Sequence, residues 1–434
     1  MLEMRSCLTA RLPSISRSGT SERVAALDRS DKVLVLGAGL QGACAALAAA
    51  QRNLSVCLID QDQGCLERAS LRNEGKIHLG HVYAHDPSFR TADLMLRAAL
   101  SFAPLLDSWC PGQFSWPHLC SNPFLYVVAR ETLVAPSQLF AHYARIEDRC
   151  RELLAEDPSL HYLGGRPTRL WETCDVPALL NPAFAAAAVS TPEASVDTHA
   201  LQRVLAAALA SEPRIELIYG HVVEEVARRE HGFTATGRTR GGERWHRDGA
   251  YVVNALWTGR LAIDAQLGLQ PGRRWVYRLK HRVVGRTPRP LAGLPSITFV
   301  LGPFGDVVTR QHDETLYLSW YPVCQTGWSQ SLQPPDVWEA AVTGALGAQQ
   351  QEPIIRDTLA AFNEIIPGLG EAGDAIADGG VIFAWGDSDI DQGDSELHQR
   401  HQIGITSEDG YFSMNTGKLT SAPYFARQLV DLLS

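Results

Sequence analysis

Residues 32–60 read KVLVLGAGLQGACAALAAAQRNLSVCLID. Residues 33–36 form a short continuous apolar run, which indicates a strand buried on both faces. A G-x-G-x-x-G loop follows at 37–42, and small apolar residues then recur at helical spacing. A second apolar run at 56–59 ends at Asp60. This order of strand, glycine loop, helix and strand predicts a βαβ unit within an α/β fold.

The loop has the chemistry of a dinucleotide site. Gly37 permits the tight turn, Gly39 lets the backbone approach a pyrophosphate, and Gly42 lets the helix pack closely on the strand. The helix N-terminus offers free N–H groups and a positive dipole end to the phosphates. Asp60 lies where a carboxylate can accept hydrogen bonds from a ribose diol. The pattern does not distinguish FAD from NAD, and a glycine turn in an ordinary βαβ unit is the structural alternative.

Length and composition limit the classes of protein. A chain of 434 residues is long for one hydrophobic core, so two domains are expected. The net charge of −9 argues against a nucleic-acid-binding surface. The nine cysteines are scattered without a C-x-x-C pair, which favours reduced thiols in a cytoplasmic protein. No apolar run reaches the roughly 18 residues of a membrane span, so we expect no transmembrane segment.

Periodicity predicts the remaining elements. The expected helices cover residues 92–106, 137–154, 201–209, 338–366 and 419–433. The expected strands cover residues 124–128, 215–218, 222–226, 251–255, 275–279, 296–301, 316–320 and 411–416. Asp197 or Thr198 should cap the helix at 201–209. Residues 1–30 are rich in Arg and Ser and lack an apolar segment, so we expect a flexible extension rather than a secretory signal.

Four separated segments together resemble the D-amino-acid oxidase superfamily of FAD-dependent enzymes, which includes glycine and sarcosine oxidases. GAGLQG with Asp60 resembles its first βαβ unit. SLRNEGKIHLGHVY, residues 70–83, resembles the S-x-x-N-x-G-x-I-H-x-G-x-x-Y pattern of L-2-hydroxyglutarate dehydrogenase. YVVNALWTG, residues 251–259, resembles the VVNAAG strand, and NTGKLTSAPYFARQLVD, residues 415–431, resembles the GGKLTTYR segment of FAD-linked glycerol-3-phosphate dehydrogenases.

The resemblance implies a two-domain architecture. A discontinuous Rossmann-like FAD-binding domain would comprise residues 31–108, 190–262 and 372–434. An α+β substrate domain on a mixed, mostly antiparallel sheet would comprise residues 109–189 and 263–371. The chain departs from the family at Asp60, where these flavoproteins usually carry Glu. No cysteine follows Cys324, so a C-terminal cysteinyl-flavin link has no counterpart. We therefore expect non-covalent FAD, with attachment through His78 as the minor alternative.

The motifs and the resemblance together predict the residues that contact the cofactor. They are Gly37, Ala38, Gly39, Leu40, Gln41, Gly42, Asp60, Gln61, Ser70, Arg72, Asn73, Glu74, Gly75, Lys76, Ile77, Val223, Asn254, Ala255, Gly417, Lys418, Leu419 and Thr420. A helix starting at 417–420 would stabilise negative charge on a reduced flavin through its dipole. An ordinary terminal strand, turn and helix is the alternative for that segment.

His78, Lys280 and Trp385 are the candidate catalytic residues. A histidine beside flavin N5 could accept a hydroxyl or ammonium proton, although it could equally be a structural histidine of its loop. Alternation along residues 277–282 sends Arg278, Lys280 and Arg282 to one strand face. For most of that face we expect solvated charge, with Lys280 or Arg278 directed at the flavin or a substrate carboxylate.

Metal sites are not expected. The spacing of His78, His81 and His85 suits neither a strand face nor a pair of helical ligands one turn apart. The run DSDID, residues 387–391, starts like a calcium loop, but Gln392 and His398 stand where that loop requires Gly and Glu.

The function expected from these observations is FAD-dependent oxidation of a small polar substrate. A hydride would leave a C–N bond of an amine or amino acid, or a C–OH bond of a 2-hydroxy acid, for flavin N5. Oxygen or a quinone would be the electron acceptor, and the oligomeric state is open. The alternatives are an NAD(P)-dependent dehydrogenase, a flavin mono-oxygenase reduced by NAD(P)H, and a non-catalytic flavoprotein subunit.

Overall fold

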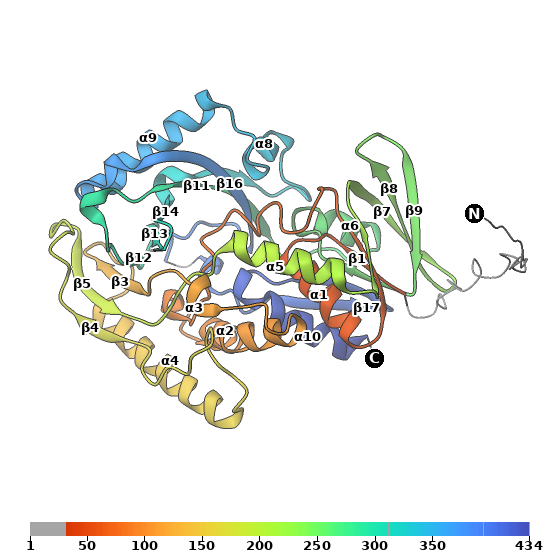
Figure 1. The fold of residues 1–434 in the computed structure, drawn as a ribbon, viewed down its shortest axis with the longest axis horizontal. Helices are drawn as coiled ribbons and strands as arrows, with labels where there is room; N and C mark the ends of the chain where they lie inside the picture. Colours follow the sequence, from red (N-terminus) through yellow and green to blue (C-terminus); the bar gives the residue numbers. More distant parts are fainter. Residues whose placement is uncertain (1–31, 311, 394, 434) are drawn as a thin grey trace, which may run out of the picture.

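The computed structural model describes residues 32–310, 312–393 and 395–433 (Figure 1). The extension expected at residues 1–30 lies outside the described residues. Two large sheets and one small sheet organise the chain, and helices cover the outer faces of the large sheets (Figure 1). In the described part of the chain, every helix is too short or too polar to span a bilayer.

The first large sheet has six strands and contains the predicted βαβ unit. In spatial order they are β17 (Gly404–Glu408), β18 (Tyr411–Asn415), β10 (Tyr251–Asn254), β1 (Lys32–Leu36), β2 (Ser55–Ile59) and β6 (Ile215–Ile218). All neighbours are parallel except β17 and β18. Residues 33–36 are completely buried, as the continuous apolar run predicts for a central parallel strand. Strands from the two ends of the chain thus lie in one sheet.

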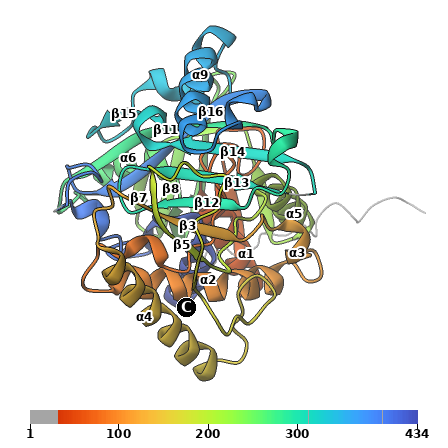
Figure 2. The same cartoon turned by 90° about the vertical axis from the view of Figure 1, so that its left-hand side faces the viewer.

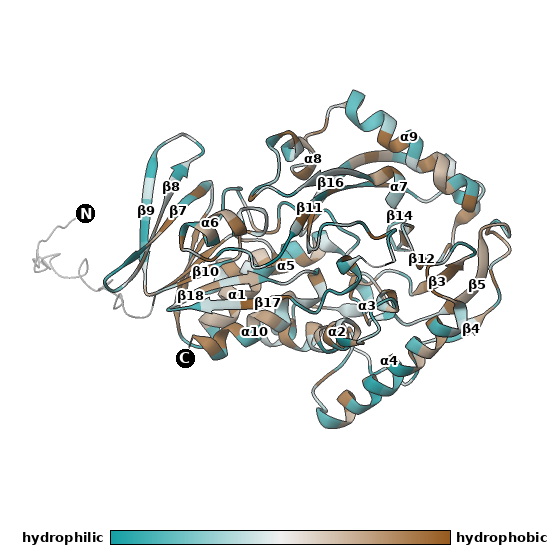
Figure 3. Ribbon diagram, turned by 180° about the vertical axis from the view of Figure 1, so that it is seen from behind, coloured by the Kyte–Doolittle hydropathy of each residue, from teal (hydrophilic) through white to brown (hydrophobic). Residues whose placement is uncertain are grey.

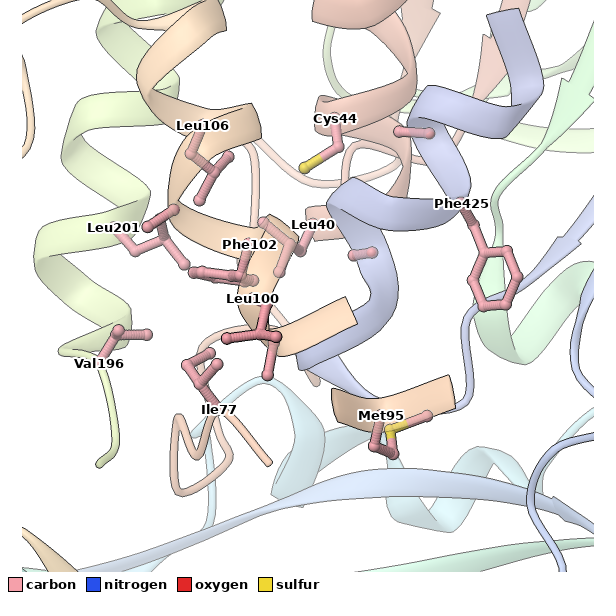
Figure 4. Packing of buried hydrophobic residues seen from close by; sticks show 14 of the residues in the cluster. Leu40, Cys44, Ile77, Met95, Leu100, Phe102, Leu106, Val196, Leu201 and Phe425 are labelled. Carbon is pink, nitrogen blue, oxygen red and sulfur yellow. The ribbon is translucent and has the colours of Figure 1, made fainter. Parts of the chain in front are cut away.

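Four helices pack together on one face of this sheet. They are α1 (Leu40–Gln51), α2 (Arg90–Trp109), α5 (Thr198–Ser211) and α10 (Ala422–Leu432). Figure 4 shows Leu100, Phe102 and Leu106 of α2 among side chains of the other three helices. The small alanines of α1 allow this close approach, and all six of them are buried. Asp197 caps α5, as predicted, by accepting the backbone N–H groups of His199 and Ala200.

A three-stranded antiparallel sheet covers the other face. Its strands are β7 (His221–Arg229), β8 (Gly232–Thr239) and β9 (Arg244–Gly249), and they project to the right in Figure 1. Phe233 and Trp245 pack in one apolar cluster with Leu34 and Leu36 of β1. The central sheet is therefore buried between two layers.

The second large sheet is mixed and mostly antiparallel, as expected. Its strands lie in the order β15 (Gln325–Ser329), β11 (Trp275–Arg286), β14 (Thr315–Trp320), β13 (Gly305–Thr309), β12 (Ser296–Val300), β3 (Phe124–Ala129), β5 (Ala185–Ser190) and β4 (Glu172–Cys174), with β16 (Gly373–Trp385) paired to β11. Only β12 and β3 are parallel. We expected residues 372–434 in the first unit, but β16 pairs with β11 along its length. The glycines of this strand gave it no clear alternation in the sequence.

Helices flank this sheet on both sides (Figure 2). Leu125 and Val127 of β3 pack in the cluster that contains α9 (Ala348–Ile365), whereas Tyr126 and Val128 pack in the cluster that contains α4 (Pro136–Glu156). Both helices direct polar faces outward (Figure 3).

The single helix predicted at 338–366 is wrong. The chain forms α8 (Glu339–Val342), breaks, and restarts as α9. Gly344 has a φ of +73°, a left-handed conformation that interrupts an α-helix.

Candidate active site

A cavity of about 740 Å³ lies between the two large sheets. This volume is within the range of roughly 300–1,000 Å³ that ligand and cofactor sites occupy. The predicted cofactor and catalytic residues that line it are Gly37, Gly39, Leu40, Gln41, Asp60, Gln61, Ser70, Arg72, Asn73, Glu74, Lys76, His78, Val223, Ala255, Lys280, Gly417, Lys418 and Leu419. Segments distant in sequence therefore converge on one cavity.

The three loop glycines differ in what a side chain would meet. A Cβ on Gly37, whose φ is +95°, would lie 2.7 Å from the Ala255 carbonyl oxygen. A Cβ on Gly42 would lie 1.8 Å from the Gly37 carbonyl oxygen, so that glycine closes the turn against α1. Gly39 has an ordinary extended conformation and lines the cavity, and its Cβ would meet only the Ser70 hydroxyl, at 3.3 Å. The open space at Gly39 fits the close approach of a pyrophosphate to the backbone.

Asp60 is held by the same loop. Its Oδ2 accepts the backbone N–H of Ala38 at 2.5 Å, and its Oδ1 accepts that of Asp62 at 2.8 Å. Burial raises the pKa of Asp60, while these two hydrogen bonds act in the opposite direction. Its carboxylate lines the cavity beside Gln61, where a ribose is expected.

Direct hydrogen bonds join the C-terminal segment to the N-terminal half of the site. The Thr416 hydroxyl donates to Oε1 of Gln41 on α1 at 3.2 Å. The Thr420 hydroxyl accepts the backbone N–H of His78 at 3.0 Å and donates to the Lys76 carbonyl at 3.1 Å. These bonds bring Gly417 and Lys418 to the cavity that the glycine loop also lines.

The ring of His78 is buried and has no hydrogen-bond partner. The side chain is 5 % exposed, and neither ring nitrogen has a partner. Nε2 lies 3.9 Å from Glu74 and Nδ1 lies 4.0 Å from Glu193. The pKa of His78 is lowered to about 3, first by burial and then by the charge of Lys418. The ring is therefore neutral at physiological pH and has a nitrogen able to accept a proton.

Cations gather around His78 and Glu74. Lys280 and Lys418 line the cavity. The pKa of Lys418 is lowered to about 8, chiefly by burial, with Arg400 adding to the decrease and Glu74 opposing it. Burial acts to raise the pKa of Glu74, but Lys418 and Lys280 outweigh it and hold that pKa at about 2.

We predicted that most of the charged face of β11 is solvated, and this prediction is wrong for two of its three cations. Arg278 is 1 % exposed and bonds Tyr321 and Asp389, the latter at 3.2 Å. Arg282 is also buried and pairs with both oxygens of Asp378, at 2.6 and 3.1 Å. Lys280 alone of the three lines the cavity. This face is packed against other elements of the protein. Alternation therefore predicted correctly which residues share the face, but it did not predict that two of them are buried.

Lys76 directs its ammonium group into the second sheet. Nζ lies 2.5 Å from Asp306, bonds the Thr298 hydroxyl, and is 4.1 Å from the centre of the Phe124 ring. The ammonium group of Lys76 therefore links its loop to the second large sheet.

Seven predicted site residues do not line the cavity. They are Ala38, Gly42, Gly75, Ile77, Asn254, Thr420 and Trp385. Asn254 donates to Asp264, Tyr411 and the Arg260 carbonyl behind the wall. Trp385 packs edge-on against Phe383. Each of the remaining five is next in sequence to a residue that lines the cavity.

Several residues that belong to this region were not predicted from the sequence. Trp257 lines the cavity with a left-handed φ of +57°, which is strained for a tryptophan. Tyr317 of β14 and His221 of β7 also line it, and no local motif marks either one. Glu193 is fully buried beside His78. A lone acid between a strand and a helix was the only signal for Glu193.

A family model described as DAO, FAD dependent oxidoreductase, matches residues 32–432. A search of curated protein sequences found no match. Among solved structures, glycine oxidase from Geobacillus kaustophilus is 17% identical with a TM-score of 0.62, covering 93% of this chain and 95% of the other. L-proline dehydrogenase from P.horikoshii is 13% identical with a TM-score of 0.61, covering 93% of each chain. L-alpha-glycerophosphate oxidase from Mycoplasma pneumoniae, with FAD bound, is 15% identical with a TM-score of 0.57, covering 93% and 94%.

Proposed function

The chain belongs to the DAO family of FAD-dependent oxidoreductases, and from that premise we propose that it oxidises a small anionic amine, amino acid or 2-hydroxy acid. The observation that carries this proposal is the cationic region of the cavity, where Lys280 and Lys418 both act on Glu74, and Lys418 also acts on the neutral His78. The names of the similar structures include both an amine and an alcohol, glycine and glycerophosphate, and so keep both bond types open.

The glycine loop would hold non-covalent FAD. Gly39 and the first N–H groups of α1 would receive the pyrophosphate, and Asp60 the adenosine ribose. The segment at Gly417 and Lys418 would lie beside the flavin ring, where positive charge stabilises a reduced flavin. When bound, FAD supplies the acceptor for a substrate hydride, and the protein supplies orientation and electrostatics.

The two lysines would orient the substrate through its negative group. A carboxylate that bonds both ammonium groups offsets their mutual repulsion, and low solvent exposure strengthens the attraction. Because the pKa of Lys418 is about 8, its charge is lost as pH rises through that value. Substrate affinity should therefore decrease above pH 8.

His78 would take the proton from the substrate hydroxyl or amine. Its neutral ring has an unpartnered nitrogen, and the carboxylates of Glu74 and Glu193 on either side would stabilise the resulting imidazolium. Removal of that proton lets the heteroatom form a double bond to carbon as the hydride leaves. Lys280 remains a second candidate for direct contact with the reacting atoms. Trp385, the third predicted catalytic residue, packs outside the cavity and would not touch the substrate.

Anaerobic reduction of the purified flavoprotein tests the function. The panel should contain amino acids, N-methyl amino acids, 2-hydroxy acids and glycerol phosphate, each paired with its neutral ester or amide where one exists. We expect an anionic compound to bleach the oxidised flavin, and its neutral partner to do so at much higher concentration.

Other outcomes would overturn the proposal. Bleaching by NAD(P)H alone would indicate a mono-oxygenase, and absence of bleaching by every compound would favour a non-catalytic flavoprotein. Equal reactivity of acids and esters would remove the lysines from substrate binding. After reduction, admission of oxygen or addition of a quinone analogue identifies the electron acceptor.

A further inference from the structure

The cavity opens to solvent along one segment of its wall, residues 333–339, which we call the strap. The exposed lining residues of the strap are Gln333, Pro335, Asp336 and Glu339. In the region expected to hold the flavin, the lining residues Lys76, His78 and Tyr317 are buried instead. A cofactor that enters with its flavin end first therefore passes the strap.

Arg68 links the strap to the other wall of the cavity. Its guanidinium bonds both oxygens of Glu339, at 2.6 and 2.8 Å, and both oxygens of Asp62, at 2.7 and 3.2 Å. The three residues line the cavity, and we call them the clasp. Their side-chain exposure rises from 8 % at Asp62 through 23 % at Arg68 to 55 % at Glu339. The clasp therefore extends from the interior of the cavity wall to its rim.

The two ends of the clasp belong to different parts of the fold. Asp62 and Arg68 follow β2 of the six-stranded sheet, and the backbone N–H of Leu66 between them bonds the glycine loop at 2.9 Å. Glu339 begins α8 directly after Trp338, which packs in one apolar cluster with residues of β11 and β16 in the second large sheet. The clasp therefore joins two separately packed walls across the mouth of the cavity.

A second attachment between the same walls lies deeper in the protein. Nη1 of Arg282 on β11 donates to the Leu71 carbonyl at 3.0 Å, and Arg282 is buried. Solvent screens a buried charge much less than the exposed carboxylate of Glu339. The walls should therefore separate first at the clasp, and the bond to Leu71 would act as the pivot.

We propose that the clasp holds the mouth of the cavity closed and that its opening limits the rates at which FAD enters and leaves. The inference depends on the FAD-binding loop and not on which substrate is oxidised. Asp60 and Gln61, where the adenosine ribose is expected, immediately precede Asp62. The clasp is therefore next to the adenosine end of the cofactor site, and the buried flavin region lies farther from the mouth.

The clasp should change the rates of FAD exchange but not the affinity. All four of its hydrogen bonds join protein groups, so they can form with or without a cofactor in the cavity. Loss of the clasp then increases the open fraction of both forms by the same factor. The rate constants kon and koff rise together, and the Kd is unchanged. For an ion pair as exposed as that of Glu339, we expect a factor of about 2–6.

The first test replaces the exposed carboxylate of the clasp. Glu339→Gln keeps the shape of the side chain and removes its charge. Stopped-flow quenching of flavin fluorescence on mixing apoprotein with FAD gives kon, and exchange of bound FAD for radiolabelled FAD in the holoprotein gives koff. We expect both constants to rise about 2- to 6-fold. An unchanged koff would overturn the proposal, and so would a rise in koff at constant kon, because the clasp would then form only around bound cofactor.

A matched variant separates the clasp from the charge of the mouth. Asp336 is also an exposed carboxylate of the strap, but it lies outside the clasp. Because the diphosphate of FAD is negative, removal of a nearby negative charge alone raises kon and lowers koff. Asp336→Asn should therefore show no rise in koff. A rise equal to that of Glu339→Gln would count against the clasp.

Two further measurements test the ion pair itself. In Arg68→Gln the clasp is already broken, so adding Glu339→Gln should raise koff no further; an additional rise equal to that in the wild-type background would refute the pairing. At about 1 M salt, where the Debye length is about 3 Å, koff of Glu339→Gln and of the wild type should become nearly equal; a ratio that salt does not change would refute an electrostatic clasp. A wild-type apoprotein that takes up no FAD would overturn the cofactor assignment of the proposed function as well as the clasp.

Discussion

Replacement of Gly39 by alanine separates cofactor binding from folding more sharply than any other change in the glycine loop. Its backbone conformation, φ −62° and ψ 175°, is one that alanine adopts without strain. The added Cβ would meet only the Ser70 hydroxyl, at 3.3 Å. The free energy of unfolding of the apoprotein should therefore change by less than about 1 kcal/mol, since Gly→Ala at a compatible position is neutral or mildly stabilising.

The same methyl group would enter the space proposed for the pyrophosphate. If it moves the diphosphate off the backbone far enough to break one charge-assisted hydrogen bond, the loss is about 1.5–3 kcal/mol. That corresponds to a roughly 10- to 140-fold increase in the Kd for FAD. Titration of apoprotein with FAD, followed by quenching of flavin fluorescence, measures this Kd, and urea denaturation measures the stability.

Two other glycines provide controls. Gly37→Ala should destabilise the protein itself, by about 1–3 kcal/mol of backbone strain alone, because its φ is +95° and its Cβ would contact the Ala255 carbonyl. Gly272 has nothing within 4 Å of its Cβ position, so Gly272→Ala should alter neither property. An unchanged Kd in folded Gly39→Ala would refute the phosphate-loop assignment, and loss of folding equal to that of Gly37→Ala would refute the geometric argument.

Three further changes test other parts of the structure. His78→Asn should slow anaerobic flavin reduction by about 10²- to 10⁴-fold while FAD is retained; wild-type kinetics would remove His78 from the chemistry. Asp378→Asn leaves the buried Arg282 and the partly buried Arg72 without their carboxylate and should lower the free energy of unfolding by about 3–5 kcal/mol in urea; a loss below about 1 kcal/mol would contradict the ion-pair argument. The pKa of His142 is lowered from 6.5 to about 4 by burial, so the unfolded chain binds more protons between these values and stability falls as pH decreases. His142→Gln should flatten that decrease by up to about 1.4 kcal/mol per pH unit, and identical pH profiles would exclude this contribution.

Local patterns predicted the parts of the site that local geometry controls. The glycine loop, the strands that flank it and the cap at Asp197 each depend on residues within a few positions of one another, and the structure has all three. The C-terminal segment around Lys418 reaches the cavity as expected, although only its resemblance to a known motif connected it to the loop.

Features that depend on packing between segments distant in sequence could not be predicted from the sequence. Alternation placed Arg278 and Arg282 on one face correctly, but nothing near β11 showed that Tyr321, Asp378 and Asp389 would bury them. The side-chain partners of Glu193 come from Tyr126 of β3 and from residues 78–81, so its sequence neighbours give no sign of its environment.

The position of β18 has a consequence for the order of folding. This strand occupies the interior of the six-stranded sheet, between β10 and β17, yet it begins at Tyr411, far along the chain from β1 at Lys32. Chains are made from the N-terminus, so β10 has no partner on this side until β18 has been synthesised. A chain truncated before Tyr411 should therefore expose the edge of β10 and be captured by chaperones or degraded before it acquires colour.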